Sequence, residues 1–220
     1  MRYRYISIKE FGGPEVLDLN TKEVLPEPNQ GEVRIKVQAT SINFTDTLIR
    51  RGIYPNIKEK PPITPGYDMV GIVDKLGHGV TDLTEGQKVA ELTVVGSYSE
   101  YIILPAERLV PVPDNVNAVE AVTMILSYVT AYQMLTRSAK VEEGSKILIH
   151  GAGGAVGNAL LQIGSFLKLK MYGTASINHH DFLKKFNCHP IDYKSEDFVQ
   201  VVKNWEPNGL DVVFDPFGGD

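Results

Sequence analysis

The sequence has a single cysteine, Cys188, among its 220 residues. One thiol excludes an intramolecular disulfide and any zinc site built from several cysteines. The sequence also lacks a basic excess, since its net charge of −5 leaves no electrostatic footprint for nucleic acid. The first residues lack the apolar core of a secretory signal, and no apolar run approaches the length of a membrane span. We therefore expect a cytoplasmic protein with no membrane span and no nucleic-acid partner.

Three catalytic signatures are absent as well. The sequence contains no nucleophile elbow, no His-Glu-x-x-His zinc motif and no Walker phosphate loop. His78, His150 and His189 belong to no motif, and we interpret each as structural.

The most informative segment is 146–164, where a short apolar run meets a glycine cluster that opens into a helical pattern. Ala152, Gly154 and Gly157 fit A-x-G-x-x-G, a dinucleotide-binding fingerprint with alanine in first place. Gly154 would let a pyrophosphate approach the backbone, and Gly157 would let the helix pack closely on the strand. The alternative is an ordinary glycine-rich turn. The strand, turn and helix all stand where the motif requires them, which favours a nucleotide site at the helix N-terminus.

Two patterns divide the chain. Segments 32–37, 69–73, 87–90 and 98–104 are predicted to be short strands separated by turns, which indicates a partly open β-barrel. Segment 117–136 is predicted to be helical, with one apolar side formed by Ala118, Ala121, Val122, Ile125 and Val129.

From residue 146 onward, predicted strands alternate with predicted helices. The strands are 146–150, 170–174, 190–192 and 211–215, and the helices are 155–167, 179–186 and 195–205. Such units build a parallel sheet with right-handed crossovers, here in the order 3-2-1-4. A complete doubly wound sheet has about six strands, so we expect a fold truncated after its fourth strand.

Several motifs in this order resemble the medium-chain dehydrogenases/reductases, in particular their zinc-free quinone oxidoreductase branch and its VAT-1-like subgroup. The motifs occupy 12–17, 42–46, 51–54, 65–71, 127–132, 151–157, 173–176, 189–193 and 215–219. The resemblance implies an α/β protein with a GroES-like substrate domain over residues 1–125 and a truncated Rossmann domain for NADP(H) over 126–220. It also implies that full-length relatives form homodimers.

We expect no metal site. Alcohol-dehydrogenase relatives place cysteine and histidine ligands near the asparagine and Pro-Gly motifs, where this chain has Asn43, Thr45, Asp46, Tyr67 and Asp68. A catalytic zinc needs about three protein ligands, and two scattered aspartates do not supply them.

The resemblance assigns catalytic roles to Asn43, which would hydrogen-bond the nicotinamide ribose or the acceptor, and to Tyr54, which would donate a proton. A free phenol stays protonated at neutral pH and can supply that proton. Asn43 could instead be a turn residue and Tyr54 a rim aromatic. We expect Asp46 to cap a helix rather than to catalyse.

NADP(H) is favoured over NAD because Ala175 and Ser176 end the second strand of the doubly wound region without the acidic residue that NAD-specific sites use. His179 stands where VAT-1-like relatives carry lysine, and it brings no full charge near pH 7, so it could equally be a solvated helix residue. The expected cofactor-binding residues are Asn43, Thr130, Gly151, Gly153, Gly154, Ala155, Val156, Gly157, Ser176, His179 and Tyr193.

The sequence thus predicts an NADPH-dependent oxidoreductase that transfers hydride to a small quinone or α,β-unsaturated carbonyl without zinc. The alternative is a non-catalytic NADP-binding interaction protein of the VAT-1-like type. Because two sheet strands are missing, we expect the 220 residues alone to turn over little.

Overall fold

A computed structural model describes residues 1–55 and 57–215. The chain divides into two compact units, Met1–Leu126 and Ser127–Asp220, and the boundary falls within α2 (Ala118–Gln133). Residues 216–219, which belong to the last sequence motif, lie outside the described residues.

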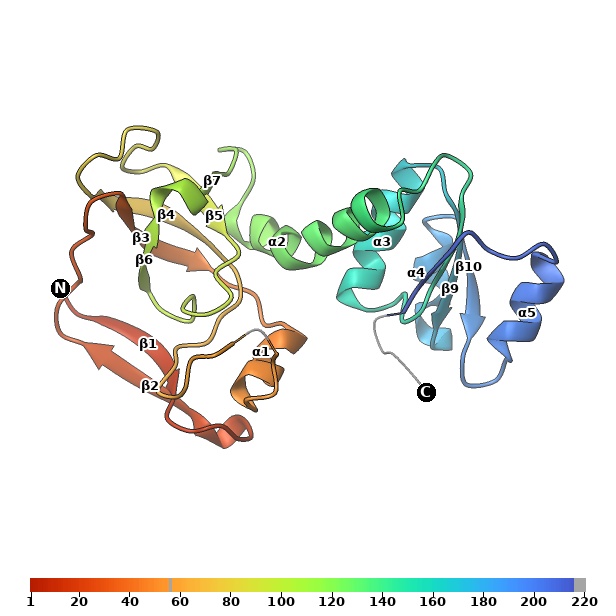
Figure 1. The fold of residues 1–220 in the computed structure, drawn as a ribbon, viewed down its shortest axis with the longest axis horizontal. Coiled ribbons are helices and arrows are strands. Elements are labelled where there is room, and N and C mark those ends of the chain that lie inside the picture. Colours follow the sequence, from red (N-terminus) through yellow and green to blue (C-terminus); the bar gives the residue numbers. More distant parts are fainter. Residues whose placement is uncertain (56, 216–220) are drawn as a thin grey trace. The chain divides into compact units, whose positions relative to one another are not determined.

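The first unit contains a five-stranded antiparallel sheet (Figure 1). Its strands are β3 (Glu32–Ala39), β4 (Met69–Leu76), β5 (Lys88–Glu91), β6 (Tyr101–Pro105) and β7 (Val110–Pro111), in the order β6-β3-β4-β5-β7. The alternation predicted for β3 is present, because Val33 and Ile35 are fully buried and face a core that also holds Met69 and Val89. All four predicted strands of this region are confirmed.

Three strands of this unit have no counterpart in the sequence prediction: β7 and the antiparallel pair β1 (Tyr3–Ile8) and β2 (Leu17–Lys22). α1 spans Phe44–Arg50 and is the helix that Asp46 was expected to cap. Short 3₁₀ turns cover Pro14–Val16 and Ala106–Arg108. Ile8 pairs with Ile63 through an isolated β-bridge, which ties the β1–β2 pair to the segment after α1.

α2 continues as a π-helical turn over Met134–Ser138, so the helix predicted over 117–136 is confirmed. Its predicted apolar side is only partly buried. Ala121 and Val122 pack into a core with Val70, whereas Val129 is 46% exposed. In the second half the buried positions are instead Ala131 and Leu135, which belong to the core of the second unit. The two halves therefore bury different faces, because each half packs into its own unit.

The helical stretch Ala118–Ser138 is long and apolar enough to cross a bilayer, with a mean hydropathy of 1.2 and 28% of its most apolar window buried. This helix is therefore an apolar run of membrane-spanning length, contrary to the expectation from the sequence. Length and composition alone are weak evidence for a span, since core helices of soluble proteins meet the same test.

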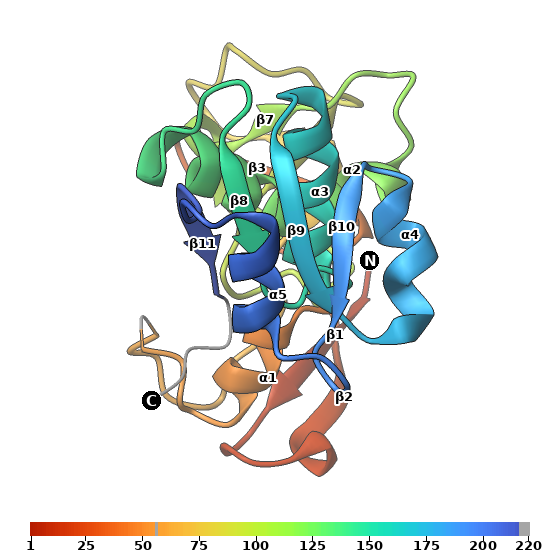
Figure 2. The ribbon, with the colours of Figure 1, turned by 90° about the vertical axis from the view of Figure 1, so that its right-hand side faces the viewer.

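The second unit is a parallel sheet flanked by helices (Figure 2). It comprises β8 (Lys146–Ile149), α3 (Ala155–Phe166), β9 (Lys170–Ala175), a 3₁₀ turn (Ile177–His179), α4 (His180–Lys184), β10 (Cys188–Asp192), α5 (Phe198–Trp205) and β11 (Val212–Phe214). The order β10-β9-β8-β11 confirms the predicted arrangement 3-2-1-4. α3 and α4 share one core on one face of the sheet, and α5 packs on the other face against Leu148, Tyr172 and Ile191.

Candidate functional site

A cavity of about 700 Å³ opens at the carboxyl ends of the parallel strands. In open α/β sheets, ligands bind in the crevice at this edge, where the strand order reverses. The lining residues come from the end of β9, from the segments that follow all four strands and from the start of α5. They are His150, Gly151, Gly153, Gly154, Thr174, Ala175, Ser176, His179, Tyr193, Phe198 and Asp215.

The glycine loop is held in shape by the neighbouring strand β9. Gly151 has a φ of 63°, a left-handed conformation that favours glycine. The Ala152 N–H donates to the Thr174 carbonyl at 2.9 Å, and the Gly151 N–H donates to the Thr174 hydroxyl at 3.2 Å. Thr174, which is only 4% exposed, therefore fixes the turn from strand to helix.

Gly157 and Gly154 differ in the space around them. A Cβ atom on Gly157 would lie 2.5 Å from the Gly151 carbonyl oxygen and 2.6 Å from the Ala152 Cα. A Cβ on Gly154 would have one neighbour within 4 Å, the Gly151 oxygen at 3.3 Å. Close packing therefore requires glycine at 157, whereas position 154 is open to a ligand.

The N-terminus of α3 presents free hydrogen-bond donors. Gly154 is the N-cap and has no side chain to accept them. Among the described residues, no acceptor contacts the backbone N–H groups of Ala155, Val156 and Gly157. Such N–H groups, at the positive end of the helix dipole, form a binding site for phosphate.

Ser176 and His179 stand together at the end of β9. The Ser176 hydroxyl lies 3.1 Å from His179 Nδ1. The His179 ring packs beside Gly153, where a Cβ would come within 2.9 Å of it. Tyr193 is 56% exposed and lies on the rim. Ala175 and Ser176, the lining residues at the end of β9, carry no carboxylate.

Five lining residues were not among the expected cofactor-binding residues: His150, Thr174, Ala175, Phe198 and Asp215. His150, interpreted as structural from the sequence, lines the cavity, and its Nδ1 lies 3.0 Å from the Thr174 hydroxyl. Phe198, at the start of α5, meets the His150 ring edge to face with centroids 4.8 Å apart. Of the predicted cofactor residues of this unit, four are not part of the cavity lining: Thr130 on α2, and Ala155, Val156 and Gly157 at the start of α3.

In the first unit, Asn43 is the N-cap of α1. Its backbone N–H donates to the Asp46 carboxylate at 2.8 Å, which forms the capping arrangement expected for Asp46. Its side-chain Nδ2 donates to the Ser41 hydroxyl at 2.8 Å and to the Asp68 carboxylate at 3.2 Å. Asp68 is 1% exposed and also accepts the Ser41 backbone N–H at 2.9 Å. The Asn43 amide is therefore held by a buried carboxylate.

Asp46 is 6% exposed, and burial raises the pKa of its carboxyl, partly offset by the Asn43 N–H. Tyr98 is the aromatic neighbour of this acidic region. Burial, followed by the negative charge of Asp46, raises the pKa of its phenol.

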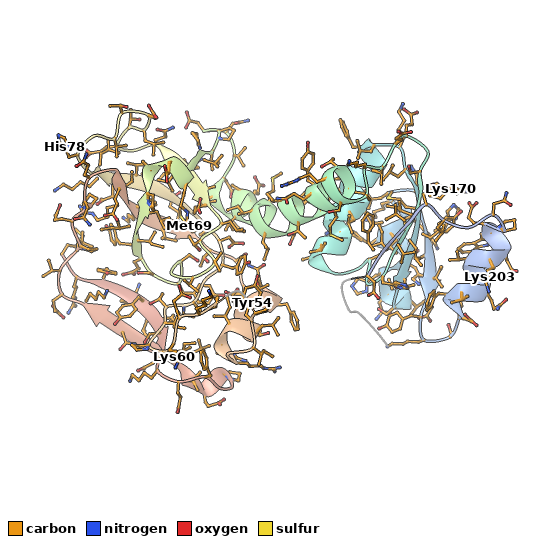
Figure 3. All side chains as sticks on the ribbon, viewed as in Figure 1. Tyr54, Lys60, Met69, His78, Lys170 and Lys203 are labelled. Atoms are coloured by element: carbon orange, nitrogen blue, oxygen red, sulfur yellow. The ribbon has the colours of Figure 1, made fainter. Side chains whose placement is uncertain are left out.

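Tyr54 lies in the segment after α1 (Figure 3). Its hydroxyl oxygen is 2.6 Å from that of Tyr67, and the two rings meet edge to face with centroids 5.9 Å apart. Tyr67 and Asp68 are neighbours in the sequence, so one short segment contacts both candidate catalytic side chains, Tyr54 and Asn43.

Among residues 1–55 and 57–215, no group of three or more histidine, cysteine, aspartate or glutamate side chains could hold a metal ion. Near Asn43, one carboxylate oxygen of Asp46 accepts the Asn43 N–H, and the Asp68 carboxylate accepts Ser41 and Asn43.

Comparison with known proteins agrees with this architecture. Residues 29–114 match the alcohol dehydrogenase GroES-like domain. The synaptic vesicle membrane protein VAT-1 homolog of Rattus norvegicus is 34% identical over 219 residues, which is 98% of this chain and 54% of the relative. The quinone oxidoreductase of Mus musculus is 34% identical over 218 residues, covering 96% of this chain and 66% of the relative.

Solved structures give the same result over nearly the whole chain. The human VAT-1 homolog-like protein superposes with a TM-score of 0.89 at 34% identity, covering 98% of this chain and 68% of that one. The Escherichia coli quinone oxidoreductase complexed with NADPH superposes with a TM-score of 0.92 at 29% identity, covering 99% and 67%.

The chain therefore belongs to the quinone oxidoreductase and VAT-1-like branch of the medium-chain dehydrogenases/reductases. It spans about half the length of the VAT-1 homologues it matches.

Proposed function

We propose that this protein is an NADPH-dependent oxidoreductase that transfers hydride to a quinone or an α,β-unsaturated carbonyl without zinc. The observation that carries the proposal is the cavity at the sheet edge, where a phosphate-binding helix N-terminus adjoins a β9 end without a carboxylate. A relative of the same fold is a quinone oxidoreductase complexed with NADPH, which supports the choice of cofactor.

The cofactor residues divide by the group each would bind. The N–H groups of Ala155 and Val156 would bind the pyrophosphate, because they point out of the helix end without other acceptors in the described chain. Ser176 and His179 would hydrogen-bond the 2′-phosphate of NADPH. Tyr193 would cover the adenosine from the rim. An acidic residue in place of Ser176 would repel that phosphate.

The first unit supplies the polar groups for the acceptor. When bound, NADPH would provide the hydride. Asn43, oriented by Asp68, would hydrogen-bond the nicotinamide ribose or the acceptor oxygen. Tyr54 would give its phenolic proton to the reduced acceptor. Quinones and enones delocalise developing negative charge, so a hydrogen bond and a proton can replace a metal ion.

Cofactor preference tests the proposal most directly. The purified protein should bind NADPH more tightly than NADH, measured by calorimetry or by nucleotide fluorescence. Ser176→Asp should weaken NADPH binding on the order of 10-fold or more, about 1.4 kcal/mol per decade, and leave NADH binding intact. Asn178→Asp is the matched control, since Asn178 is exposed on the same turn but outside the cavity lining. Equal affinities of the unaltered protein for the two cofactors would contradict the proposal.

Turnover separates the reductase from a non-catalytic NADP-binding interaction protein. NADPH oxidation should accelerate when 1,2-naphthoquinone or phenanthrenequinone is added, and the acceptor should be consumed in equal amount. Because we expect little turnover from the 220 residues alone, the measured quantity is the ratio of NADPH oxidation with and without the acceptor. Tight NADPH binding with a ratio of one would favour the interaction protein instead.

A further inference from the structure

The hydrogen bond between Tyr54 and Tyr67 has a definable direction. The two oxygens are 2.6 Å apart, and either could be the donor by distance alone. Tyr67 is only 7% exposed, whereas Tyr54 is half-buried and borders solvent. Among the described residues, Tyr54 is the only hydrogen-bond partner of the Tyr67 hydroxyl.

Burial therefore decides which hydroxyl donates. If Tyr54 donated, the Tyr67 hydrogen would point into a buried region without an acceptor in the described chain, and an unsatisfied buried donor is costly. If Tyr67 donates, its buried hydrogen has an acceptor in the Tyr54 oxygen. The Tyr54 hydrogen can then turn outward to water or to a ligand. Burial and the neighbouring Tyr54 also raise the pKa of Tyr67, so Tyr67 keeps its hydrogen when the solution becomes alkaline.

We propose that Tyr67 is a positioning residue that acts through Tyr54. The Tyr67 hydroxyl donates to the Tyr54 oxygen, which turns the Tyr54 hydrogen toward the acceptor. This inference rests on the proposed function, in which Tyr54 is the proton donor.

The acceptor takes a hydride from the reduced nicotinamide, and the resulting anion takes the proton of the Tyr54 O–H bond, whose electron pair stays on the Tyr54 oxygen. The Tyr67 hydrogen bond then stabilises this phenolate, since hydrogen bonds to a charged oxygen are stronger than those to a neutral one. A proton from water restores the phenol.

The ring contact between Tyr54 and Tyr67 allows a substitution that removes only the hydroxyl group. The Tyr67 and Tyr54 rings meet edge to face with their centroids 5.9 Å apart. Phenylalanine at position 67 retains this ring contact and removes the hydroxyl. Tyr67→Phe thus removes the donor and leaves no unsatisfied polar atom at position 67. Tyr101→Phe is the matched control, because Tyr101 lies in β6 of the same unit and its hydroxyl contacts only the Met1 sulfur among the described residues.

A double-mutant cycle tests the inference on the full chain. Tyr67→Phe should lower kcat on the order of 10- to 100-fold while KM for NADPH stays within about 2-fold. In a Tyr54→Phe background, Tyr67→Phe should cause no further loss, because its effect passes through Tyr54. Equal losses in the two backgrounds, or a loss no larger than that of Tyr101→Phe, would overturn the inference.

A spectroscopic measurement separates this inference from the function on which it rests. In protein labelled with ¹³Cζ-tyrosine, the Tyr54 resonance is identified by its disappearance in Tyr54→Phe. It should shift in Tyr67→Phe and stay in place in Tyr101→Phe. An unmoved resonance would refute the hydrogen bond itself. A shifted resonance with full turnover in Tyr54→Phe would keep the hydrogen bond but refute the proton-donor role, and the positioning role with it.

Discussion

Replacing Gly157 with alanine tests the steric reason for the last glycine of the loop. The new Cβ would lie 2.5 Å from the Gly151 oxygen and 2.6 Å from the Ala152 Cα. Both are backbone atoms of the loop that lines the cavity, so the start of α3 or the loop itself must move. Overpacking of this kind costs about 1–3 kcal/mol, and a contact with backbone belongs at the upper end of that range.

A gain offsets part of this cost, because alanine favours a helix over glycine by about 1 kcal/mol. Subtracting this gain from an overpacking cost of about 3 kcal/mol leaves a net loss of about 2 kcal/mol in the free energy of unfolding. The displaced loop should also weaken NADPH binding, since the phosphate-binding N–H groups move with it.

Gly164→Ala is the matched control for this prediction. Gly164 lies in the same helix and receives the same intrinsic gain, but its Cβ would meet the sulfur of Met171 at 2.5 Å, a side-chain contact. A methionine side chain can change rotamer and adapt, so Gly164→Ala should lose less stability than Gly157→Ala. Urea denaturation of both variants and NADPH titration are the measurements. A Gly157→Ala protein with unchanged stability and affinity would show that the close approach does not constrain this turn.

Three other outcomes follow from the structure. The Glu206 carboxyl accepts hydrogen bonds from Lys146, Lys170 and Tyr172, which lower its pKa from 4.5 to about 2. Because the pKa is lower in the folded state, the carboxylate stabilises the fold fully above pH 4.5. This stabilisation is lost as the pH falls toward 2. The thermal midpoint should therefore drop in that interval, and a Glu206→Gln protein that shows the same pH-dependent drop would contradict this assignment. Burial raises the pKa of the Cys188 thiol to about 12, so a thiol reagent should modify it at pH 8 only after denaturant is added. Elemental analysis should find no stoichiometric zinc in the purified protein, and chelators should leave turnover unchanged; about one bound zinc per chain would refute the donor-set argument.

The doubly wound region could be predicted from sequence because its signals are local. Each strand is a short apolar run, each helix follows at the usual spacing, and the glycine loop marks the first crossover. β1 and β2 were missed for a physical reason. β2 alternates only between exposed and half-buried positions, so it contains no apolar run. Eight residues including Pro14 separate β1 from β2, so no tight turn in the sequence indicates a hairpin.

The site was only partly predictable, since its remaining contacts depend on tertiary structure. The glycine loop is contiguous in sequence, and a motif can find it. Thr174 stabilises that loop from 23 residues away, and His150 joins the lining because its ring contacts Thr174 and Phe198. No pattern of residue types predicts these pairs without the strand register that brings β9 beside β8.

The Pro-Gly segment before β4 positions Tyr54 and Asn43 through hydrogen bonds. Gly66 has a φ of 110°, and a Cβ there would lie 2.5 Å from the Tyr98 backbone nitrogen, so the turn is tightly constrained. Tyr67 and Asp68 follow directly and reach Tyr54 and Asn43. In the function proposed here, two hydrogen-bonding side chains that follow this turn orient the proton donor and the amide. Tyr67→Phe should then affect Tyr54 and leave Asn43 in place, whereas loss of the Asp68 carboxylate should affect Asn43 and Ser41 and leave Tyr54 in place.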